Sequence, residues 1–138
     1  MTTEYKKPLP RPISVELTRP FWEAAKRHEL MMPRCTKCDH FHFYPREECP
    51  RCFSREIEWA TVSGRGRLHS YTIVHQAANR VFQDDTPHVY AMVQLDEGPR
   101  MISNVVDCEL DDLRVDMPLL AVFDDVTPEW TLVKFKPA

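Results

Sequence analysis

The chain contains 138 residues, and its 18 Lys and Arg against 21 Asp and Glu give a formal net charge of −3 at pH 7. This length predicts one domain, or two very small ones if something other than a hydrophobic core stabilises the second. Hydrophobic residues make up 43% and charged residues 28%, which is ordinary globular usage and excludes wholesale disorder. No apolar run approaches the roughly 20 residues of a membrane span. The N-terminus lacks the apolar core of a signal peptide, so we expect a cytoplasmic protein with no membrane association.

Two residue counts are unusual. The chain has 12 Pro but only 3 Gly, and it has 5 Cys. An odd number of cysteines without an export signal argues against a disulfide scaffold and favours metal ligands, nucleophiles or small buried side chains. The slightly acidic balance disfavours a non-specific nucleic-acid binder, which normally carries an excess of basic residues.

The first 30 residues are expected to form an extended arm followed by a helix. Alternating prolines at positions 8, 10 and 12 fix their own φ and favour extended geometry in the residues before them. This arm is either a disordered tail or a segment that lies along a partner subunit. Thr18 is the predicted N-cap of the helix, Pro20 suits its first turn, and the helix is expected to end near Glu29.

The rest of the chain predicts a mainly β protein. Runs rich in β-branched and aromatic residues alternate with turn signals at near-regular spacing, which indicates a small barrel of four to five strands in about 80 residues. A long polar loop at 76–87 and a short helical or irregular link at 109–115 connect them. The predicted strands are residues 56–63, 67–75, 88–95, 100–106, 119–123 and 131–135.

The sharpest signal is a pair of Cys-x-x-Cys motifs, formed by Cys35 and Cys38 and then by Cys49 and Cys52. Each pair places both sulfurs inside one tight turn, and a hairpin brings the two turns together, so four thiolates can converge on one tetrahedral ion. Redox-active pairs would instead each start a helix after a strand, whereas Pro50 favours a turn. Zinc is preferred because nothing else in the sequence suggests electron transfer, although the spacing alone fits iron as well.

The predicted zinc site is structural, because four cysteines fill all positions of a tetrahedral ion and leave none for a substrate. His40 and His42 are rival ligands in principle, but with four cysteines present we expect surface or packing residues. Cys108 lies outside the motif and is expected to be a buried or inert thiol. Four basic residues are placed to offset the negative charge of the thiolates, namely Arg34, Lys37, Arg46 and Arg51.

No catalytic signature accompanies the cysteine motifs. The sequence lacks a nucleophile elbow, a phosphate-binding loop, a dinucleotide fingerprint and a His-Glu-x-x-His motif. Its acidic doublets fall at predicted turns, where solvated carboxylates explain them better than a catalytic pair does. We therefore expect a chain that is not catalytic on its own.

The order of helix, cysteine motifs and barrel resembles the OB-fold proteins with an N-terminal rubredoxin-like zinc ribbon, the acyl-CoA-associated family long described as a domain of unknown function. The resemblance runs from about residue 20 to the C-terminus. It is carried by Pro20-Phe21-Trp22-Glu23-Ala24-Ala25, Pro33-Arg34-Cys35-Thr36-Lys37-Cys38, Phe43-Tyr44-Pro45-Arg46, Cys49-Pro50-Arg51-Cys52, Trp59, Ser63-Gly64-Arg65-Gly66, Val93-Gln94-Leu95-Asp96-Glu97-Gly98-Pro99-Arg100, Phe123-Asp124-Asp125-Val126 and Phe135-Lys136-Pro137.

The resemblance implies three parts: an N-terminal arm and helix at 1–30, a rubredoxin-like zinc ribbon at 31–56, and a five-stranded OB-fold barrel at 57–138. Such proteins resemble accessory subunits of thiolase-fold enzymes, including acyl-CoA thiolases, 3-hydroxy-3-methylglutaryl-CoA synthase assemblies and aldolases that shorten steroid side chains as CoA thioesters. The implied role is a non-catalytic subunit that stabilises a hetero-oligomer with a thiolase-fold partner, for which a dimer of heterodimers is one arrangement.

The same resemblance implies that the chain helps to bind an acyl-CoA. A ligand that bears phosphates calls for guanidinium groups, which bind phosphate oxygens in a bidentate manner. The candidate contacts to the CoA moiety are Arg46, Arg51, Arg65 and Arg67.

The chain departs from the family where zinc knuckles usually place glycine, just after the second cysteine, because that position needs a positive φ. Asp39 and Phe53 stand there, and Asp116 stands where a glycine often precedes a late barrel strand. Asp tolerates left-handed backbone whereas Phe does so poorly, which predicts a less regular second knuckle.

Two other functions compete with the accessory role. OB-folds and zinc ribbons often bind single-stranded nucleic acids, and Arg65, Arg67, His69 and Tyr71 would offer a small patch for it. The net charge of −3 and the acidic turns do not favour this alternative. The other alternative is an iron-containing electron carrier of the rubredoxin type.

Overall fold

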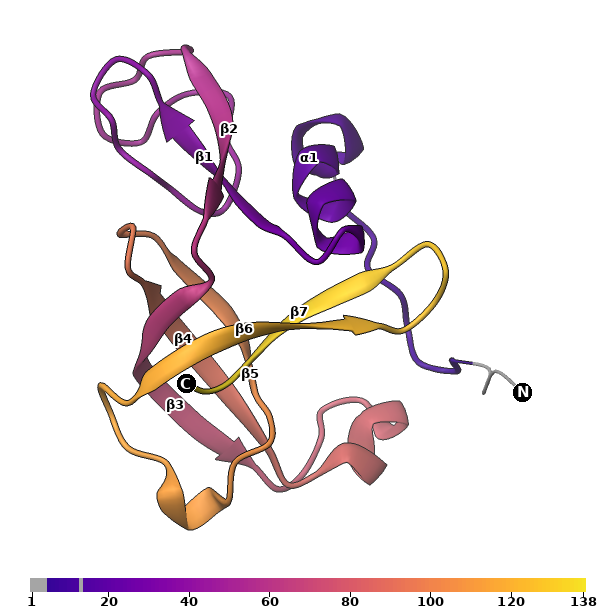
Figure 1. Cartoon of the computed structure of the whole chain (residues 1–138). Coiled ribbons are helices and arrows are strands. Elements are labelled where there is room, and N and C mark those ends of the chain that lie inside the picture. Colours follow the sequence, from indigo (N-terminus) through magenta and orange to yellow (C-terminus); the bar gives the residue numbers. More distant parts are fainter. Residues whose placement is uncertain (1–4, 13) are drawn as a thin grey trace.

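The computed structural model describes residues 5–12 and 14–138. Figure 1 shows one helix beside a two-stranded ribbon and a barrel. Within the described residues, no helix is long and apolar enough to cross a membrane. The elements are α1 (Val15–Lys26), β1 (Leu30–Cys35), β2 (Ile57–Val62), β3 (Arg65–Val74), the 3-10 helix η1 (Arg80–Asp85), β4 (His88–Leu95), β5 (Arg100–Val105), the 3-10 helix η2 (Leu110–Asp112), β6 (Pro118–Asp125) and β7 (Thr131–Pro137).

The five-stranded barrel is confirmed. Its strands follow the order β3-β4-β5-β7-β6, and β3 pairs antiparallel with both β4 and β6, which closes the barrel. Alternate residues of β4 are buried, as the alternation of its sequence requires, and the fully buried Leu68 and Phe135 fill the interior from β3 and β7. One seam is weak, because β5 and β7 pair in parallel only at Val105 and Phe135.

The ribbon contains a strand that the sequence analysis missed. β1 pairs antiparallel with β2 along its whole length, from Leu30 opposite Val62 to Cys35 opposite Ile57. Its burial does not alternate strictly, and it contains Pro33, so no strand periodicity is visible in the sequence. The strand predicted at 56–63 therefore belongs with β1 and not with the barrel strands. The division of the chain at residue 57 stays a prediction.

Helix α1 begins before Thr18 and ends at Lys26, so both predicted helix ends are wrong. Thr18 lies inside the helix and does not cap it. The helix ends because His28 takes a left-handed backbone with φ of 59°. The N–H groups of His28 and of the following residue then bond back to the carbonyls of Ala25 and Ala24, each at 2.9 Å, the arrangement that commonly terminates helices.

A long hairpin formed by β6 and β7 extends beyond the barrel and holds α1 (Figure 1). Trp22 of the helix meets Trp130 edge to face, with ring centroids 5.0 Å apart. His28 stacks on Phe123 and places its Nε2 atom 2.8 Å from an Asp125 carboxylate oxygen. These contacts fix the helix, which carries one wall of the cavity described below.

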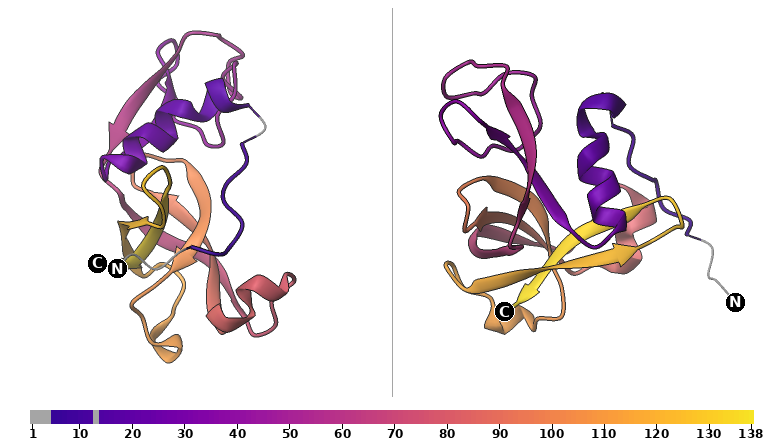
Figure 2. Two further views of the ribbon diagram at one scale, coloured as in Figure 1. Left: turned by 90° about the vertical axis from the view of Figure 1, so that its right-hand side faces the viewer. Right: turned by 45° about the horizontal axis from the view of Figure 1, so that its top comes forward.

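The described part of the N-terminal arm lies along the chain's own barrel (Figure 2). Lys7 forms an ion pair with Asp85 of η1, and the hydrogen bond between them raises the pKa of Lys7. Pro10 and Pro12 line a cavity beside α1. Residues 5–12 therefore contact this chain's own η1 and cavity wall, and both a disordered tail and contact with a partner subunit stay predictions; residues 1–4 lie outside the described range.

Gly66 is expected to tolerate no side chain, because a Cβ atom there would lie 2.5 Å from the backbone carbonyl oxygen of Gln94. We expect Gly66→Ala to lower the free energy of unfolding by about 2 kcal/mol, as overpacking against backbone does. Urea unfolding followed by circular dichroism measures this. The control Ser70→Ala, at an exposed position of the same strand, is expected to change it by less than about 0.5 kcal/mol. Equal effects of the two variants would contradict the prediction.

Candidate metal centre and two adjoining cavities

Four cysteine sulfurs converge in the ribbon. The Sγ atoms of Cys35, Cys38, Cys49 and Cys52 all lie within 4.8 Å of one another. The separations Cys35–Cys52 and Cys38–Cys49 are both 3.6 Å. Zinc–sulfur bonds of about 2.3 Å in a tetrahedron would put the sulfurs about 3.8 Å apart, whereas a disulfide needs about 2.0 Å. The arrangement therefore fits one tetrahedral metal ion and is too open for disulfides.

The two knuckles that carry these sulfurs are built alike. The residue after the second cysteine has left-handed backbone in both, with φ of 61° at Asp39 and 64° at Phe53. Its N–H donates to the carbonyl of the first cysteine, Cys35 or Cys49, at 2.9 Å. The prediction of a less regular second knuckle is wrong, because Phe53 adopts this backbone despite its side chain. That side chain is 73% exposed, so no packing offsets the strain.

The electrostatics of the cluster call for a cation. Burial acts to raise the pKa of Cys49, but the N–H groups of Cys52 and Arg51 outweigh it and lower this pKa to about 7. Cys38 behaves in the opposite way: the N–H of His40 acts to lower its pKa, but burial and the neighbouring sulfurs raise it to about 12. Four adjacent sulfurs cannot all be thiolates without a positive charge among them, and a bound Zn²⁺ would supply that charge.

His40 and His42, the predicted rival ligands, are not part of the metal-binding cluster found among the described residues. His42 is a packing residue with an exposed fraction of 5%, and neither of its ring nitrogens has a hydrogen-bond partner in the described part of the chain. His40 is half-buried. Cys108 is half-buried too, and burial raises its pKa, which agrees with the expected inert thiol.

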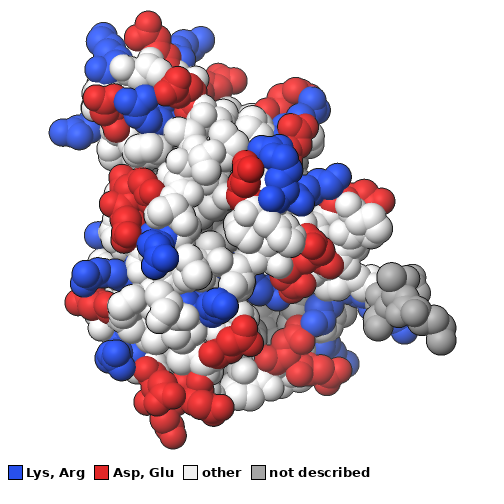
Figure 3. Space-filling model, viewed as in Figure 1, with Lys and Arg blue, Asp and Glu red and all other residues white. Residues whose placement is uncertain are grey.

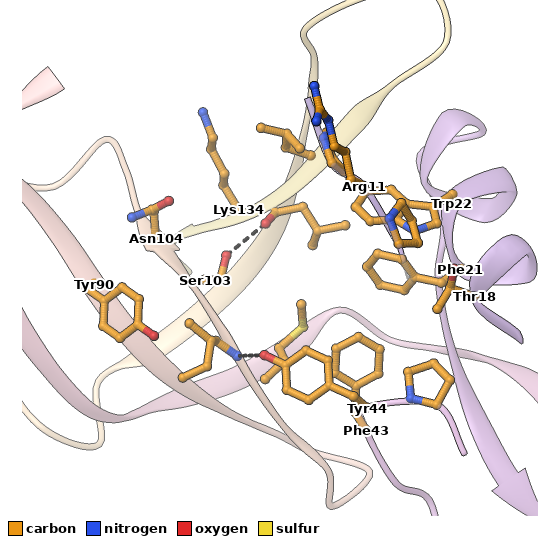
Figure 4. A pocket seen from close by; sticks show the side chains of 17 residues that line it. Arg11, Thr18, Phe21, Trp22, Phe43, Tyr44, Tyr90, Ser103, Asn104 and Lys134 are labelled. Carbon is orange, nitrogen blue, oxygen red and sulfur yellow. Dashed lines mark hydrogen bonds between the residues drawn. The ribbon is translucent and has the colours of Figure 1, made fainter. Parts of the chain in front are cut away.

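An apolar cavity of about 520 Å³ lies where α1, the loop of the ribbon and the barrel meet (Figure 4). It follows the weak seam between β5 and β7. Tyr44 reaches across from the ribbon, and its hydroxyl accepts a hydrogen bond from the Ile102 N–H of β5 at 3.1 Å. Arg11 and Lys134 supply the charged groups of its lining. Aromatic and aliphatic side chains form most of the wall, among them Phe21, Trp22, Phe43, Tyr90, Met101 and Leu132.

A second cavity of about 650 Å³ adjoins the first, and Phe43, Tyr44 and Pro45 line both. We call it the polar cavity because two arginines and two histidines line it. Arg46 from the ribbon and Arg100 from β5 both line this second cavity. The sequence analysis missed both Tyr44 and Arg100 as site residues. Each stands in a segment that carried the family resemblance, but no local pattern brings a ribbon loop against a barrel strand.

The four arginines predicted to contact CoA do not form one patch, although all four are exposed. Arg46 lines the polar cavity, whereas Arg51, Arg65 and Arg67 line neither of the two cavities described above. A β-bulge between Leu68 and Ser70 shifts the register of β3, and Tyr71 packs against the core. The small patch that would bind nucleic-acid bases is therefore broken.

Charged residues around the ribbon are mostly paired or mixed in sign. Arg34, which was expected to offset the thiolates, forms ion pairs with the carboxylates of Asp39 and Glu58. Figure 3 shows Lys and Arg interspersed with Asp and Glu over the ribbon, and a largely uncharged surface between ribbon and barrel on this face. This face shows no continuous basic stripe of the kind that tracks a nucleic-acid backbone.

The ribbon and the barrel both match known families. Residues 22–58 match the family described as "ChsH2, rubredoxin-like zinc ribbon domain", and residues 59–124 match "ChsH2, C-terminal OB-fold domain". The chain is thus a zinc-ribbon and OB-fold protein. It belongs to the ChsH2/DUF35 family, as the relatives described next also show.

The relatives include a DUF35 domain-containing scaffold protein of Methanocaldococcus jannaschii, which is 36% identical over 74% of this chain and 73% of that protein. A probable enoyl-CoA hydratase alpha subunit of Thermomonospora curvata is 34% identical over 94% of this chain, which spans only 40% of that relative's length. The benzoylsuccinyl-CoA thiolase subunit BbsA of Geobacter metallireducens is 31% identical over 60% of this chain and 53% of that protein.

A solved structure has the same fold over nearly its whole length. It is a chain of an Ltp2-ChsH2(DUF35) aldolase, 31% identical in sequence. The TM-score is 0.81, over 92% of this chain and 98% of that chain. The relatives named here thus include a scaffold protein, a subunit of a thiolase and a chain of an aldolase.

Cys49→Ser is expected to abolish metal binding, because three thiolates leave the tetrahedron incomplete. Elemental analysis should find about one zinc ion per chain in the unaltered protein and a small fraction of that in the variant. Cys108→Ser, which removes the cysteine outside the cluster, should keep the full zinc content. A coloured, iron-containing protein, or full zinc content in Cys49→Ser, would refute the assignment.

Phe53→Gly is expected to stabilise the ribbon by about 1 kcal/mol, because glycine adopts left-handed backbone without the steric cost that a Cβ atom imposes. Competition with a metal chelator during denaturant unfolding measures this. Phe53→Ala is the matched control, since it removes the exposed ring but keeps Cβ, and it should give little gain. Equal stabilisation by both variants would show that the exposed ring, and not the backbone, is the cause.

Proposed function

We propose that this chain is a non-catalytic accessory subunit that assembles with a thiolase-fold partner, an acyl-CoA thiolase or an acyl-CoA aldolase. The observation that carries the proposal is the likeness to a chain of the Ltp2-ChsH2(DUF35) aldolase, which extends over 98% of that chain. The relative BbsA, a thiolase subunit, supports it as well. The assembly is a hetero-oligomer in the cytoplasm, for which a dimer of heterodimers is one arrangement.

The metal site supports a structural role in this proposal. Cys35, Cys38, Cys49 and Cys52 would hold Zn²⁺, and the ion would supply folding energy to the ribbon, since four protein sulfurs leave it no position for a substrate. The reacting groups would then belong to the partner, while this chain would stabilise the complex through its contacts with that partner.

We propose further that the chain helps to bind the CoA thioester. Among the four arginine candidates, the placement of Arg46 in a cavity supports it over the other three. Arg51, Arg65 and Arg67 remain candidates only for contacts made together with the partner. No observation favours the alternative of a single-stranded nucleic-acid-binding module, because Tyr71 packs inward and the charges on the visible face are mixed.

Native mass spectrometry of the complex purified from source cells tests the accessory role. We expect this chain to co-elute with a thiolase-fold subunit in a stable stoichiometry, and the partner's activity to rise when the chain is added back to it. Cys49→Ser should lose the stimulation because the ribbon unfolds, whereas Cys108→Ser should retain it. Isolation as a lone monomer, together with no change in the partner's activity on addition, would overturn the proposal.

A further inference from the structure

We propose that the polar cavity is a phosphate-binding subsite and that the apolar cavity beside it takes the hydrocarbon part of the same ligand. The two cavities would then form one site for an amphiphilic phosphate ester. The choice of this ligand class rests on the proposed function, in which the chain helps to bind a CoA thioester. The positions of the two ends of the ligand come from the cavities themselves.

Two arginines line the polar cavity, and neither is paired with a carboxylate of the described residues. Neither Arg46 nor Arg100 forms an ion pair with any of the described residues, and both line the cavity. Among the described residues that line it there is no carboxylate. Nε of Arg100 donates to the side-chain oxygen of Gln94 at 2.6 Å, which orients the guanidinium and leaves its terminal N–H groups for a ligand. A guanidinium pair of this kind suits a phosphate or diphosphate.

His42 gives a second, independent indication. It lines the polar cavity, it is 95% buried, and neither ring nitrogen has a partner among the described residues. Burial lowers its pKa, and the nearby His40 and Arg46 lower it further. A buried polar side chain without a partner is uncommon in proteins. Here it lines the same cavity as Arg46 and Arg100, which form no ion pair with the described residues, and an anionic ligand would complete this setting.

The positive surface continues from the cavity across the barrel. Arg67 of β3 lies opposite Gln94 of β4, and Gln94 lies opposite Arg100 of β5. Side chains at directly opposed positions of antiparallel strands stand about 5 Å apart on the same face. Of the predicted CoA contacts that line neither cavity, Arg67 alone is aligned with Arg100 by the strand register. It adds one cation to the row that runs from Arg100 through Gln94.

The apolar compartment begins where the polar one ends. Phe43, Tyr44 and Pro45 line both, so a ligand that passes Tyr44 would reach from the guanidinium groups into the aromatic and aliphatic walls of the first cavity. A volume of about 520 Å³ is within the range of small-molecule sites, roughly 300–1,000 Å³. Because a cavity lined by arginines adjoins an apolar cavity, the two favour a ligand with a phosphate end and a hydrocarbon end over a nucleic-acid strand.

Calorimetric titration of the full-length, zinc-loaded chain tests the site with three probes: pyrophosphate, decanoate and decanoyl-CoA. We expect decanoyl-CoA to bind at least about tenfold more tightly than either single-part probe, because its two ends are linked. Arg46→Gln and Arg100→Gln should each weaken pyrophosphate and decanoyl-CoA about tenfold and leave decanoate unchanged. Tyr90→Ser, at the wall of the apolar cavity, should weaken decanoate and leave pyrophosphate unchanged.

Arg55→Gln is the matched control, since Arg55 is an exposed arginine of the same ribbon that pairs with Glu48 and lines neither cavity. The proposal would be overturned if this variant weakened pyrophosphate binding as much as Arg46→Gln does. It would also be overturned if the unaltered chain did not bind pyrophosphate. A single-stranded oligonucleotide that outcompetes decanoyl-CoA in an Arg46-dependent manner would overturn it in favour of nucleic acid. A partner complex that forms normally while pyrophosphate fails to bind would reject this site and leave the accessory role intact.

Discussion

The convergence of four cysteine sulfurs is the constraint on which the rest of the ribbon depends. Between β1 and β2 the described chain makes no further strand and only one isolated bridge, from Arg34 to Phe41. Few buried apolar side chains come from this segment, so it has little core of its own. The loop nevertheless carries Phe43, Tyr44 and Arg46, which line the two cavities. Whatever holds the sulfurs together therefore also positions the walls of the candidate ligand site.

Much of this architecture could be predicted from local patterns. The cysteine spacing indicates a four-sulfur cluster, and the alternation in β4 places a barrel strand at His88–Leu95. The family usually places glycine at the positions of Asp39, Phe53 and Asp116, and all three have positive φ, although the irregular second knuckle expected from Phe53 is not observed. These features succeed because each depends on a few neighbouring residues, whose spacing or backbone preference is visible in the sequence.

Other features depend on contacts between distant segments, and local patterns do not contain them. The strand β1 is stabilised by pairing with β2 some 25 residues later, although Pro33 interrupts its strand pattern. Tyr44 meets Ile102 across 58 positions of the chain, and Arg100 joins Arg46 only because the ribbon folds back on the barrel. The cavities arise from this packing, and no pattern within either segment indicates it.

The scarcity of glycine has a structural consequence. The chain has only 3 Gly, yet its turns require many left-handed residues. Aspartate and histidine tolerate this backbone better than most residues, because their short polar side chains bond locally. Phenylalanine has no such advantage, which makes Phe53 the exception in the set. The non-glycine residues with positive φ in the described part of the chain are His28, Asp39, Phe53, Asp107 and Asp116.

The single hydrogen bond from the Ile102 N–H to the Tyr44 hydroxyl has a consequence for solubility. Because β5 meets β7 at only one residue pair, most of its outer backbone edge lacks a neighbouring strand. Unpaired strand edges are templates on which other chains add strands, and natural proteins usually cover them. Tyr44 of the ribbon covers part of this edge, so the ribbon also hinders the pairing of other chains with the barrel. A molecule whose ribbon unfolds would expose an intact barrel with an open edge, and aggregation would begin there.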